Sequence, residues 1–287
     1  MTLLLGMCGK DIVAVAADSA ARKSAGPEPD DIKVLPLGGR FITARSGGNG
    51  STLDPVRFDF SRWTPKSGEP VPLRVGASPS SFPHLDRTGE SRWEVFMERF
   101  GAEVGELDSY EEVWSALMAY MERVFQAEQR IIRETGWSIN PWTEWHWLAG
   151  FDNAGFTVIR QWQATGDADG VRVIADKELR HGRPGPDAYG WITGGSGQRF
   201  AAEWVARSRW GVMTQEDVMR MASECMTYSI RRSQETGIGD LGGNPRLVIS
   251  KRGSGTESLI LLDGWKPAAP TPEVRRPVVV RKPRWMF

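Results

Sequence analysis

Short apolar runs of strand length open the chain and are separated by turn residues. The first two runs are joined by Gly9-Lys10-Asp11, and a tight, glycine-containing turn between apolar runs predicts a β-hairpin. The next two are joined by residues 37–40, which include two glycines. Strands are therefore predicted over residues 2–8, 12–17, 32–36 and 41–45.

The middle of the chain changes to a helical period. Between residues 110 and 135, apolar side chains recur on one helical face, at Val113, Leu117, Tyr120, Met121, Val124 and Phe125. Ser109 and Glu112 have the spacing of a capping box, and Gly136 ends the segment. Helices are therefore predicted over residues 92–104 and 110–135.

The second half of the chain returns to strands, passes through two more helices and ends in strands. Strands are predicted over residues 145–150, 156–163, 171–175, 189–193, 246–250 and 258–262, and helices over residues 198–208 and 215–234, the latter capped by Thr214. Neighbouring strands with short turns pair antiparallel, which argues against a βαβ arrangement. Two sequential pairs of helices would cover two packed sheets. The predicted fold class is α+β, a four-layer αββα sandwich of two antiparallel sheets.

The 287 residues predict one domain over residues 1–264, with a helical, Trp-rich insert around residues 52–140. Residues 265–287 are predicted to be a Pro- and Arg-rich C-terminal arm that does not build a core of its own, and that is either flexible or docked on a neighbouring subunit. The chain holds 13 tryptophans, which we expect to fill the core or a subunit interface.

Charge and cysteine use narrow the range of functions. Lys+Arg and Asp+Glu both number 36, so the net charge is zero. A chain without net positive charge has no overall attraction to nucleic acid or to an anionic membrane. Cys8 and Cys225 form no paired motif, which argues against a disulfide framework or a zinc site. The three histidines, His84, His146 and His181, are scattered and have no matched carboxylate, so we expect surface or core roles and no metal ligation. No cofactor is implied.

The apolar start of the chain is short and lacks a basic flank. Neither a signal peptide nor a membrane span is therefore predicted there. Together with the two unpaired cysteines, this start favours a cytoplasmic protein.

Thr2 is the first candidate for chemistry. A threonine hydroxyl is a weak nucleophile without an adjacent base. Removal of Met1 would give Thr2 a free α-amine, which titrates near pH ~8 and can act as that base. A threonine at position 2 is common, so this signal depends on its surroundings.

The surroundings of Thr2 resemble the start of proteasome β subunits and of their bacterial relatives, the heat-shock peptidase HslV and the Anbu-type homologues. The shared features are an apolar strand from Thr2 that contains Gly6, and a second strand that ends in Ala17-Asp18-Ser19. The resemblance covers residues 2–50 well and residues 145–262 in outline. It implies the N-terminal-nucleophile (Ntn) hydrolase fold and threonine-peptidase activity.

The resemblance assigns roles to several residues. Asp18 takes the place of the aspartate that pairs with a catalytic lysine, and Lys33 takes the place of that lysine. A buried Lys33 would lower the pKa of the Thr2 hydroxyl and amine. Gly47 takes the place of the glycine whose N–H forms the oxyanion hole. Arg45, at the floor of the pocket for the side chain before the cut, would favour acidic or small polar residues, and Gly48 is expected beside the substrate.

Two later segments extend the resemblance. Gly195-Ser196-Gly197 resembles the family's Gly-Ser-Gly-Ser segment, in which the first serine positions the terminal amine; Ser196 carries that role here. Residues 232–237 resemble the family's Arg-Asp-x-x-Ser-Gly, in which Thr236 stands for the serine. Ser233 stands where the family has an aspartate that supports the amine, so the amine needs another partner, such as Asp240 or a water.

Three functions are compatible with these features. The first is a threonine peptidase acting on peptides or unfolded proteins in a homo-oligomeric ring or related assembly, for which an ATP-dependent unfoldase is a compatible partner. The second is a small-molecule amidase of the Ntn group. The third is a non-catalytic, proteasome-like scaffold. No nucleic-acid or membrane partner is expected.

Overall fold

A computed structural model of the chain describes residues 2–20, 22–23, 26–27, 32–47, 100, 107–120, 122, 142–166, 171–181, 190–208, 214–237 and 241–260. Gly48, Asp240 and the C-terminal arm lie outside the described residues. The same holds for most of the predicted insert and of the helix predicted over residues 92–104, in which Phe100 alone is described.

The first sheet is built around the hairpin that opens the chain. Its two central strands are apolar throughout and buried at every residue, because the sheet is covered on both faces. All of its neighbouring strands pair antiparallel. The order across the sheet is β10 (Gly190–Gly194), β1 (Leu4–Cys8), β2 (Ile12–Ala17), β11 (Arg246–Lys251) and β12 (Gly255–Ile260).

The second sheet is a meander in which every strand pairs antiparallel with the next one along the chain. Pro36 lies in an edge strand, which has a neighbouring strand on one side only. A residue without an N–H is tolerated there, because an edge strand needs backbone hydrogen bonds on that side alone. The order is β5 (Val34–Leu37), β6 (Phe41–Gly47), β7 (Trp142–Phe151), β8 (Thr157–Gly166) and β9 (Val171–His181). Two further short strands, β3 (Arg22–Lys23) and β4 (Gly26–Pro27), pair with each other.

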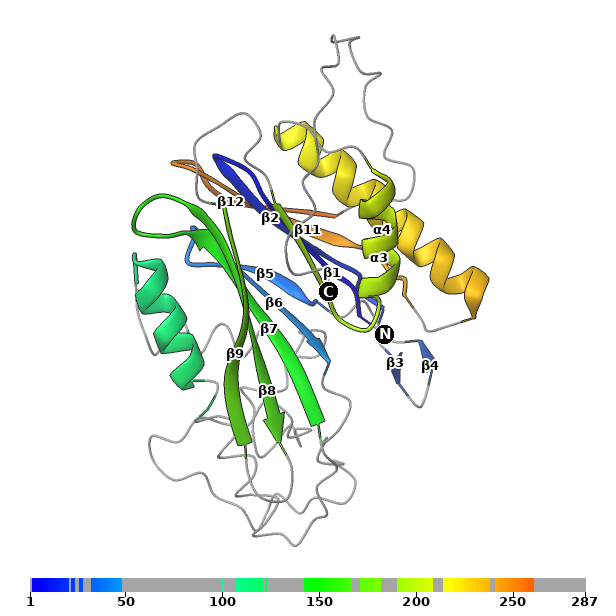
Figure 1. The fold of residues 1–287 in the computed structure, drawn as a ribbon, viewed down its shortest axis with the longest axis horizontal. Helices are drawn as coiled ribbons and strands as arrows, with labels where there is room; N and C mark the ends of the chain where they lie inside the picture. Colours follow the sequence, from blue (N-terminus) through cyan, green and yellow to red (C-terminus); the bar gives the residue numbers. More distant parts are fainter. Residues whose placement is uncertain are drawn as a thin grey trace, which may run out of the picture.

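Helices cover the outer face of each sheet (Figure 1). Helices α3 (Gln198–Arg207) and α4 (Gln215–Thr236) pack on the first sheet through a buried apolar cluster that includes Leu5, Met221 and Cys225. The helix over residues 110–120 packs on the second sheet through a cluster that includes Leu117 and Trp162. Helix α4 begins at the capping box of Thr214 and Asp217 and ends at Gly237, whose φ of 61° is in the left-handed region.

A third apolar cluster fills the space between the two sheets. It joins Leu4 and Val15 of the first sheet to Ile42, Trp147 and Ile159 of the second. The described layers are therefore helices, sheet, sheet and helix, and the prediction of an α+β chain with two antiparallel sheets is confirmed. Trp147 and Trp162 are fully buried in these layers, as expected for core tryptophans.

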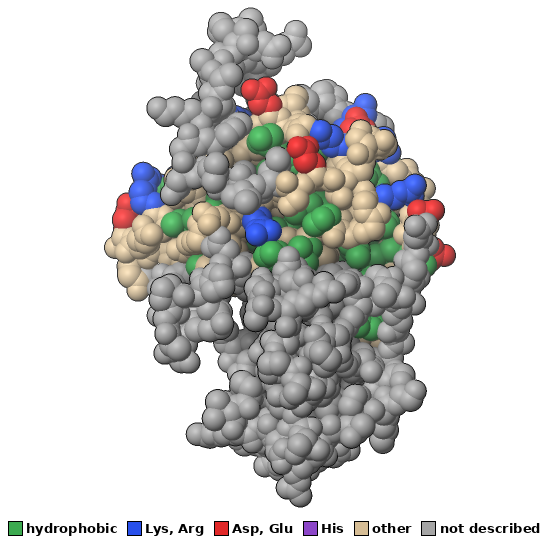
Figure 2. All heavy atoms as spheres, turned by 180° about the vertical axis from the view of Figure 1, so that it is seen from behind, with side chains coloured by type: hydrophobic (Ala, Val, Ile, Leu, Met, Phe, Trp, Pro, Cys, Tyr) green, Lys and Arg blue, Asp and Glu red, His purple; other side chains and the backbone are tan. Residues whose placement is uncertain are grey.

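On the face shown in Figure 2, basic and acidic side chains of the described residues are interspersed with small hydrophobic areas. Within the described part of the chain, no helix combines the length and the apolar character needed to span a membrane.

Candidate active site

Thr2 lies two residues before β1 and beside the turn that follows β10. Its backbone N–H donates to Ser196 Oγ at 3.2 Å, and its carbonyl oxygen accepts from the Gly197 N–H at 2.9 Å. The antiparallel pairing of β1 with β10, in which Leu4 faces Gly194, brings the two segments together across almost 200 residues of sequence. The predicted nucleophile and its predicted amine partner are therefore in contact.

Gly195 is required in this turn for two reasons. Its φ is +79°, which L side chains rarely adopt. A Cβ atom at this position would also collide with the carbonyl group of Thr2. The turn between β10 and α3 therefore approaches Thr2 more closely than any other residue type would allow.

Asp18 is the residue after β2. It extends the pairing of β1 with β2 by one step, because it is hydrogen-bonded to the backbone of Leu3. The Leu3 N–H donates to Asp18 Oδ1 at 2.7 Å, and the Asp18 N–H donates to the Leu3 carbonyl at 3.2 Å. Asp18 Oδ2 lies 3.1 Å from Lys33 Nζ, and both side chains are almost fully buried, with 0% and 4% of their surface exposed. Lys33 Nζ also donates to the Ala20 carbonyl at 2.7 Å. Asp18 thus connects the residue after Thr2 to a buried ammonium.

Burial raises the pKa of the Asp18 carboxyl, because the charged form is removed from water. The Lys33 ammonium and the Leu3 N–H oppose this rise in pKa, since both favour the carboxylate. Lys33 is the largest of the influences that lower this pKa, and through Asp18 its ammonium is linked to Leu3, the residue before β1.

Strand β6 runs beside this pair. The Arg45 N–H donates to the Lys33 carbonyl at 2.9 Å, and Gly47 is the last residue of the strand. Ile42 and Ala44 face the inter-sheet core, while Phe41 faces the outer helix. By the two-residue alternation of a strand, Arg45 shares the face of Phe41, and the substrate role of Arg45 stays a prediction.

Ser46 lies beside Gly195, the residue of the turn that approaches Thr2, and the sequence did not single it out. It lies on the inter-sheet face of β6, with 2% of its surface exposed. A Cβ built on Gly195 would lie 3.4 Å from Ser46 Cβ, on the same side as the Thr2 carbonyl. The only sequence signal for this position was its place between Arg45 and Gly47.

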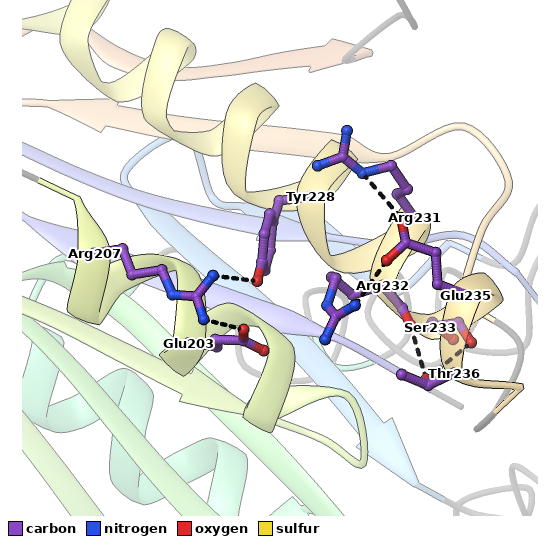
Figure 3. A network of polar contacts seen from close by, with 8 residues as sticks. All are labelled: Glu203, Arg207, Tyr228, Arg231, Arg232, Ser233, Glu235 and Thr236. Atoms are coloured by element: carbon purple, nitrogen blue, oxygen red, sulfur yellow. Dashed lines mark hydrogen bonds and ion pairs between the residues drawn. The ribbon is translucent and has the colours of Figure 1, made fainter.

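Ser233 and Thr236 lie on the last turns of α4, and Figure 3 shows them among the polar contacts of α3 and α4. Ser233 is buried, whereas Thr236 is exposed. The Thr236 hydroxyl donates to the carbonyls of Arg232 at 2.8 Å and of Ser233 at 3.3 Å. Among the described contacts, the Thr236 side chain therefore bonds only to carbonyls of its own helix, and no contact joins it to Thr2.

The same view shows how α3 and α4 are linked at their surface (Figure 3). Arg207 reaches Glu203 at 2.7 Å along α3, and its guanidinium donates to the Tyr228 hydroxyl of α4 at 3.4 Å. Arg232 pairs with Glu235 at 2.7 Å on α4. These contacts join side chains that are partly or largely exposed.

His146 does have a carboxylate partner, contrary to the sequence prediction. Its Nε2 lies 3.1 Å from Glu144 Oε2, both residues are buried, and the imidazole stacks on Trp162. The missed signal was the two-residue spacing, which places both side chains on one face of a strand. His146 is a core residue, as expected, and Glu144 pairs across the sheet with Gly47.

The two cysteines are free and buried, and burial raises the pKa of each thiol to about 12. A buried thiol with such a pKa holds almost no thiolate at neutral pH. Cys8 and Cys225 are therefore poor nucleophiles, which leaves Thr2 as the stronger candidate.

No protein-family model matches this sequence, and no curated protein is significantly similar to it. Any functional assignment therefore depends on the geometry around Thr2 and on the sequence motifs that it brings together.

Proposed function

We propose that this chain is an Ntn hydrolase with the fold of that class, and that it acts as a threonine peptidase of the proteasome β-subunit type. The observation that carries the proposal is the placement of Thr2. Its backbone nitrogen contacts Ser196 Oγ, and the next residue is bonded to the buried Asp18–Lys33 pair. Four residues singled out for this chemistry thus lie in one connected arrangement.

The proposed reaction begins with removal of Met1, which frees the α-amine of Thr2. The Thr2 hydroxyl attacks the scissile carbonyl and gives its proton to the α-amine. The Gly47 N–H donates to the oxyanion that forms. Collapse of this intermediate expels the amine half of the substrate, which takes the proton, and leaves an ester on Thr2 that water hydrolyses. Ser196 orients the amine, and the Lys33 charge favours the ionised hydroxyl.

The proposal extends to substrate and assembly. The substrate would be a peptide or an unfolded protein, and Arg45 would favour acidic or small polar side chains before the cut. The chain would form a homo-oligomeric ring or related assembly in the cytoplasm, with an ATP-dependent unfoldase as a compatible partner.

The test is covalent labelling of Thr2. Intact mass would first establish that Met1 is absent, and a peptide epoxyketone or a β-lactone would then add one equivalent to Thr2. Thr2→Ala should abolish both labelling and peptide cleavage, whereas Thr2→Ser, which keeps a hydroxyl on the same residue, should retain labelling. A protein that keeps Met1, or one in which the label falls elsewhere, would refute the proposal.

A second candidate is a non-catalytic protein of the same fold. The observation that favours it is Ser233, a buried serine where the family has an aspartate. The labelling experiment separates the two, since a scaffold would show no Thr2 adduct. A small-molecule amidase would be labelled but would not cleave peptides.

A further inference from the structure

Ser46 carries a buried hydroxyl that the described structure does not satisfy. Its side chain is 2% exposed, and Oγ has no hydrogen-bond partner among the described residues. A buried hydroxyl without a partner is unfavourable, so such groups in folded proteins call for an explanation. The neighbourhood of Ser46 offers one.

Ser46 lies beside the turn whose Ser196 side chain accepts a hydrogen bond from the Thr2 nitrogen. The turn runs from Gly194 to Gly197, and Ser196 Oγ accepts from the Thr2 N–H at 3.2 Å. A Cβ on Gly195 would touch both the Thr2 carbonyl and Ser46 Cβ. Thr2 and Ser46 therefore lie against the same residue of the turn, on the face of β6 that turns toward the first sheet.

The number of donors on Thr2 changes if Met1 is removed. A peptide nitrogen has one N–H, and here it donates a hydrogen bond to Ser196 Oγ. A free α-ammonium has three N–H groups. The additional donors need acceptors near Thr2, and the carboxylate that the resemblance leads us to expect is replaced by Ser233.

We propose that Ser46 is a positioning residue for the Thr2 α-amine, whose Oγ accepts a hydrogen bond from the amine directly or through one water. This inference rests on the proposed function in requiring a free α-amine. Two hydroxyls, those of Ser196 and Ser46, would then hold the amine. Neutral acceptors stabilise an ammonium less than a carboxylate does, so more of the amine is free base at neutral pH. That condition suits a general base.

The test compares three variants at Ser46 with a matched control. Ser46→Ala removes the hydroxyl, Ser46→Thr keeps it, and Ser46→Cys replaces it with a weakly bonding thiol of similar size. Thr43→Val is the control, because Thr43 carries another buried hydroxyl without a described partner on the opposite face of the same strand.

The first measurement is the pKa of the Thr2 α-amine, obtained from trace acylation across a pH series and peptide mass spectrometry of Met1-free protein. Loss of an acceptor from the ammonium disfavours the charged form, so Ser46→Ala and Ser46→Cys should lower this pKa by roughly half a unit to one unit. Ser46→Thr and Thr43→Val should leave it unchanged. A purely structural role of Ser46 would alter the melting temperature and not this pKa.

The second measurement is peptide cleavage. Ser46→Ala should lower kcat by about tenfold with KM nearly constant, because the amine acts in the chemical step. A labelled, active enzyme in which Ser46→Ala and Ser46→Cys leave both the amine pKa and kcat unchanged would overturn the inference alone. If the wild-type protein is not labelled at Thr2 but Ser46→Ala still lowers the pKa of the α-amine, the proposed function is overturned and the inference about Ser46 is not. Retention of Met1 would overturn both.

Discussion

The Asp18–Lys33 pair is buried, and Asp18 is bonded to Leu3, the residue after Thr2. Removing two ions from water is costly, and a buried pair contributes little net stability compared with an apolar pair of similar size. Breaking it is a different matter, because one charge is then left buried without a partner. A gain in net stability therefore does not by itself account for the burial of these two charges.

Lys33→Met should therefore destabilise the protein by about 3–5 kcal/mol at pH 7. The loss should shrink on acidification. The reason is that burial raises the folded-state pKa of Asp18, and without Lys33 this pKa rises further. The native state then takes up a proton before the unfolded chain does, so the free energy of unfolding of the variant increases as pH falls through that pKa. Urea denaturation at pH 7 and pH 5 measures both effects.

Arg40→Met is the matched control for this prediction. Arg40 and Asp108 also form an ion pair of 3.1 Å, but their side chains are 62% and 83% exposed. Solvent screens such a pair, and its loss should change stability by at most about 1 kcal/mol. Equal losses in Lys33→Met and Arg40→Met would show that burial of the Asp18–Lys33 pair has no energetic consequence.

The residues around Thr2 were predictable to different degrees. The apolar pattern predicted the strands that Thr2, Asp18 and Lys33 lie in or next to, whereas the pairing of Asp18 with Lys33 was expected only from the resemblance to proteasome β subunits. Ser46 was missed because a strand pattern does not say which of its two faces meets a segment 150 residues away. The Asp18 contact to the Leu3 N–H was missed because side-chain to backbone bonds leave no periodic signal.

At the scale of elements, α4 depends on a reciprocal cap. The Thr214 hydroxyl accepts from the Asp217 N–H at 3.1 Å, and Asp217 Oδ2 accepts from the Thr214 N–H at 3.0 Å. Thr214→Ala should lower the free energy of unfolding by about 1 kcal/mol, because it leaves a donor of the first turn unsatisfied. Thr214→Ser keeps the acceptor and should restore most of the loss in urea denaturation. A variant Thr214→Ala as stable as the wild type would mean that the cap is dispensable.

The extents of two strands show what the sequence pattern leaves out. Strand β9 was predicted to end at residue 175, but it continues to His181 through charged residues. It is an edge strand held to β8 by backbone hydrogen bonds, which are indifferent to side-chain polarity. Strand β12 likewise begins at Gly255, ahead of the predicted residue 258, because Thr256 and Glu257 pair with β11 despite being polar. Apolar patterning finds the buried centre of a sheet better than its edges.

At the scale of the whole molecule, the spacing of the two sheets depends on Gly6. This residue lies in the middle of β1, and a Cβ built on it would lie 2.6 Å from Ile159 Cδ1 and 3.0 Å from the Trp147 ring, both in the second sheet. It would also lie 2.8 Å from Ile192 Cγ2 in β10. Distances under 3.0 Å are too short for carbon contacts, so the layers can approach this closely only where a side chain is missing.

Gly6→Ala should therefore destabilise the protein by about 1–3 kcal/mol, measured as the free energy of unfolding in urea, because the added methyl overpacks the inter-sheet core. Gly242→Ala is the control. Among the described residues, a Cβ on Gly242 would meet only Ala20, at 3.9 Å, so this variant should stay within about 0.5 kcal/mol of the wild type.

The double variant Gly6→Ala/Ile159→Val identifies the cause of the loss. Ile159→Val alone should cost about 0.5–1.5 kcal/mol, since it removes a buried methyl group. That methyl is Cδ1, the atom nearest the added Cβ, so its removal makes room for the alanine. The loss of the double variant should then be smaller than the sum of the two single losses by more than about 0.5 kcal/mol, as expected for atoms that occupy the same space. Additive losses would place the strain of Gly6→Ala elsewhere, at Ile192 or Trp147, and would mean that Ile159 does not set how closely the sheets approach.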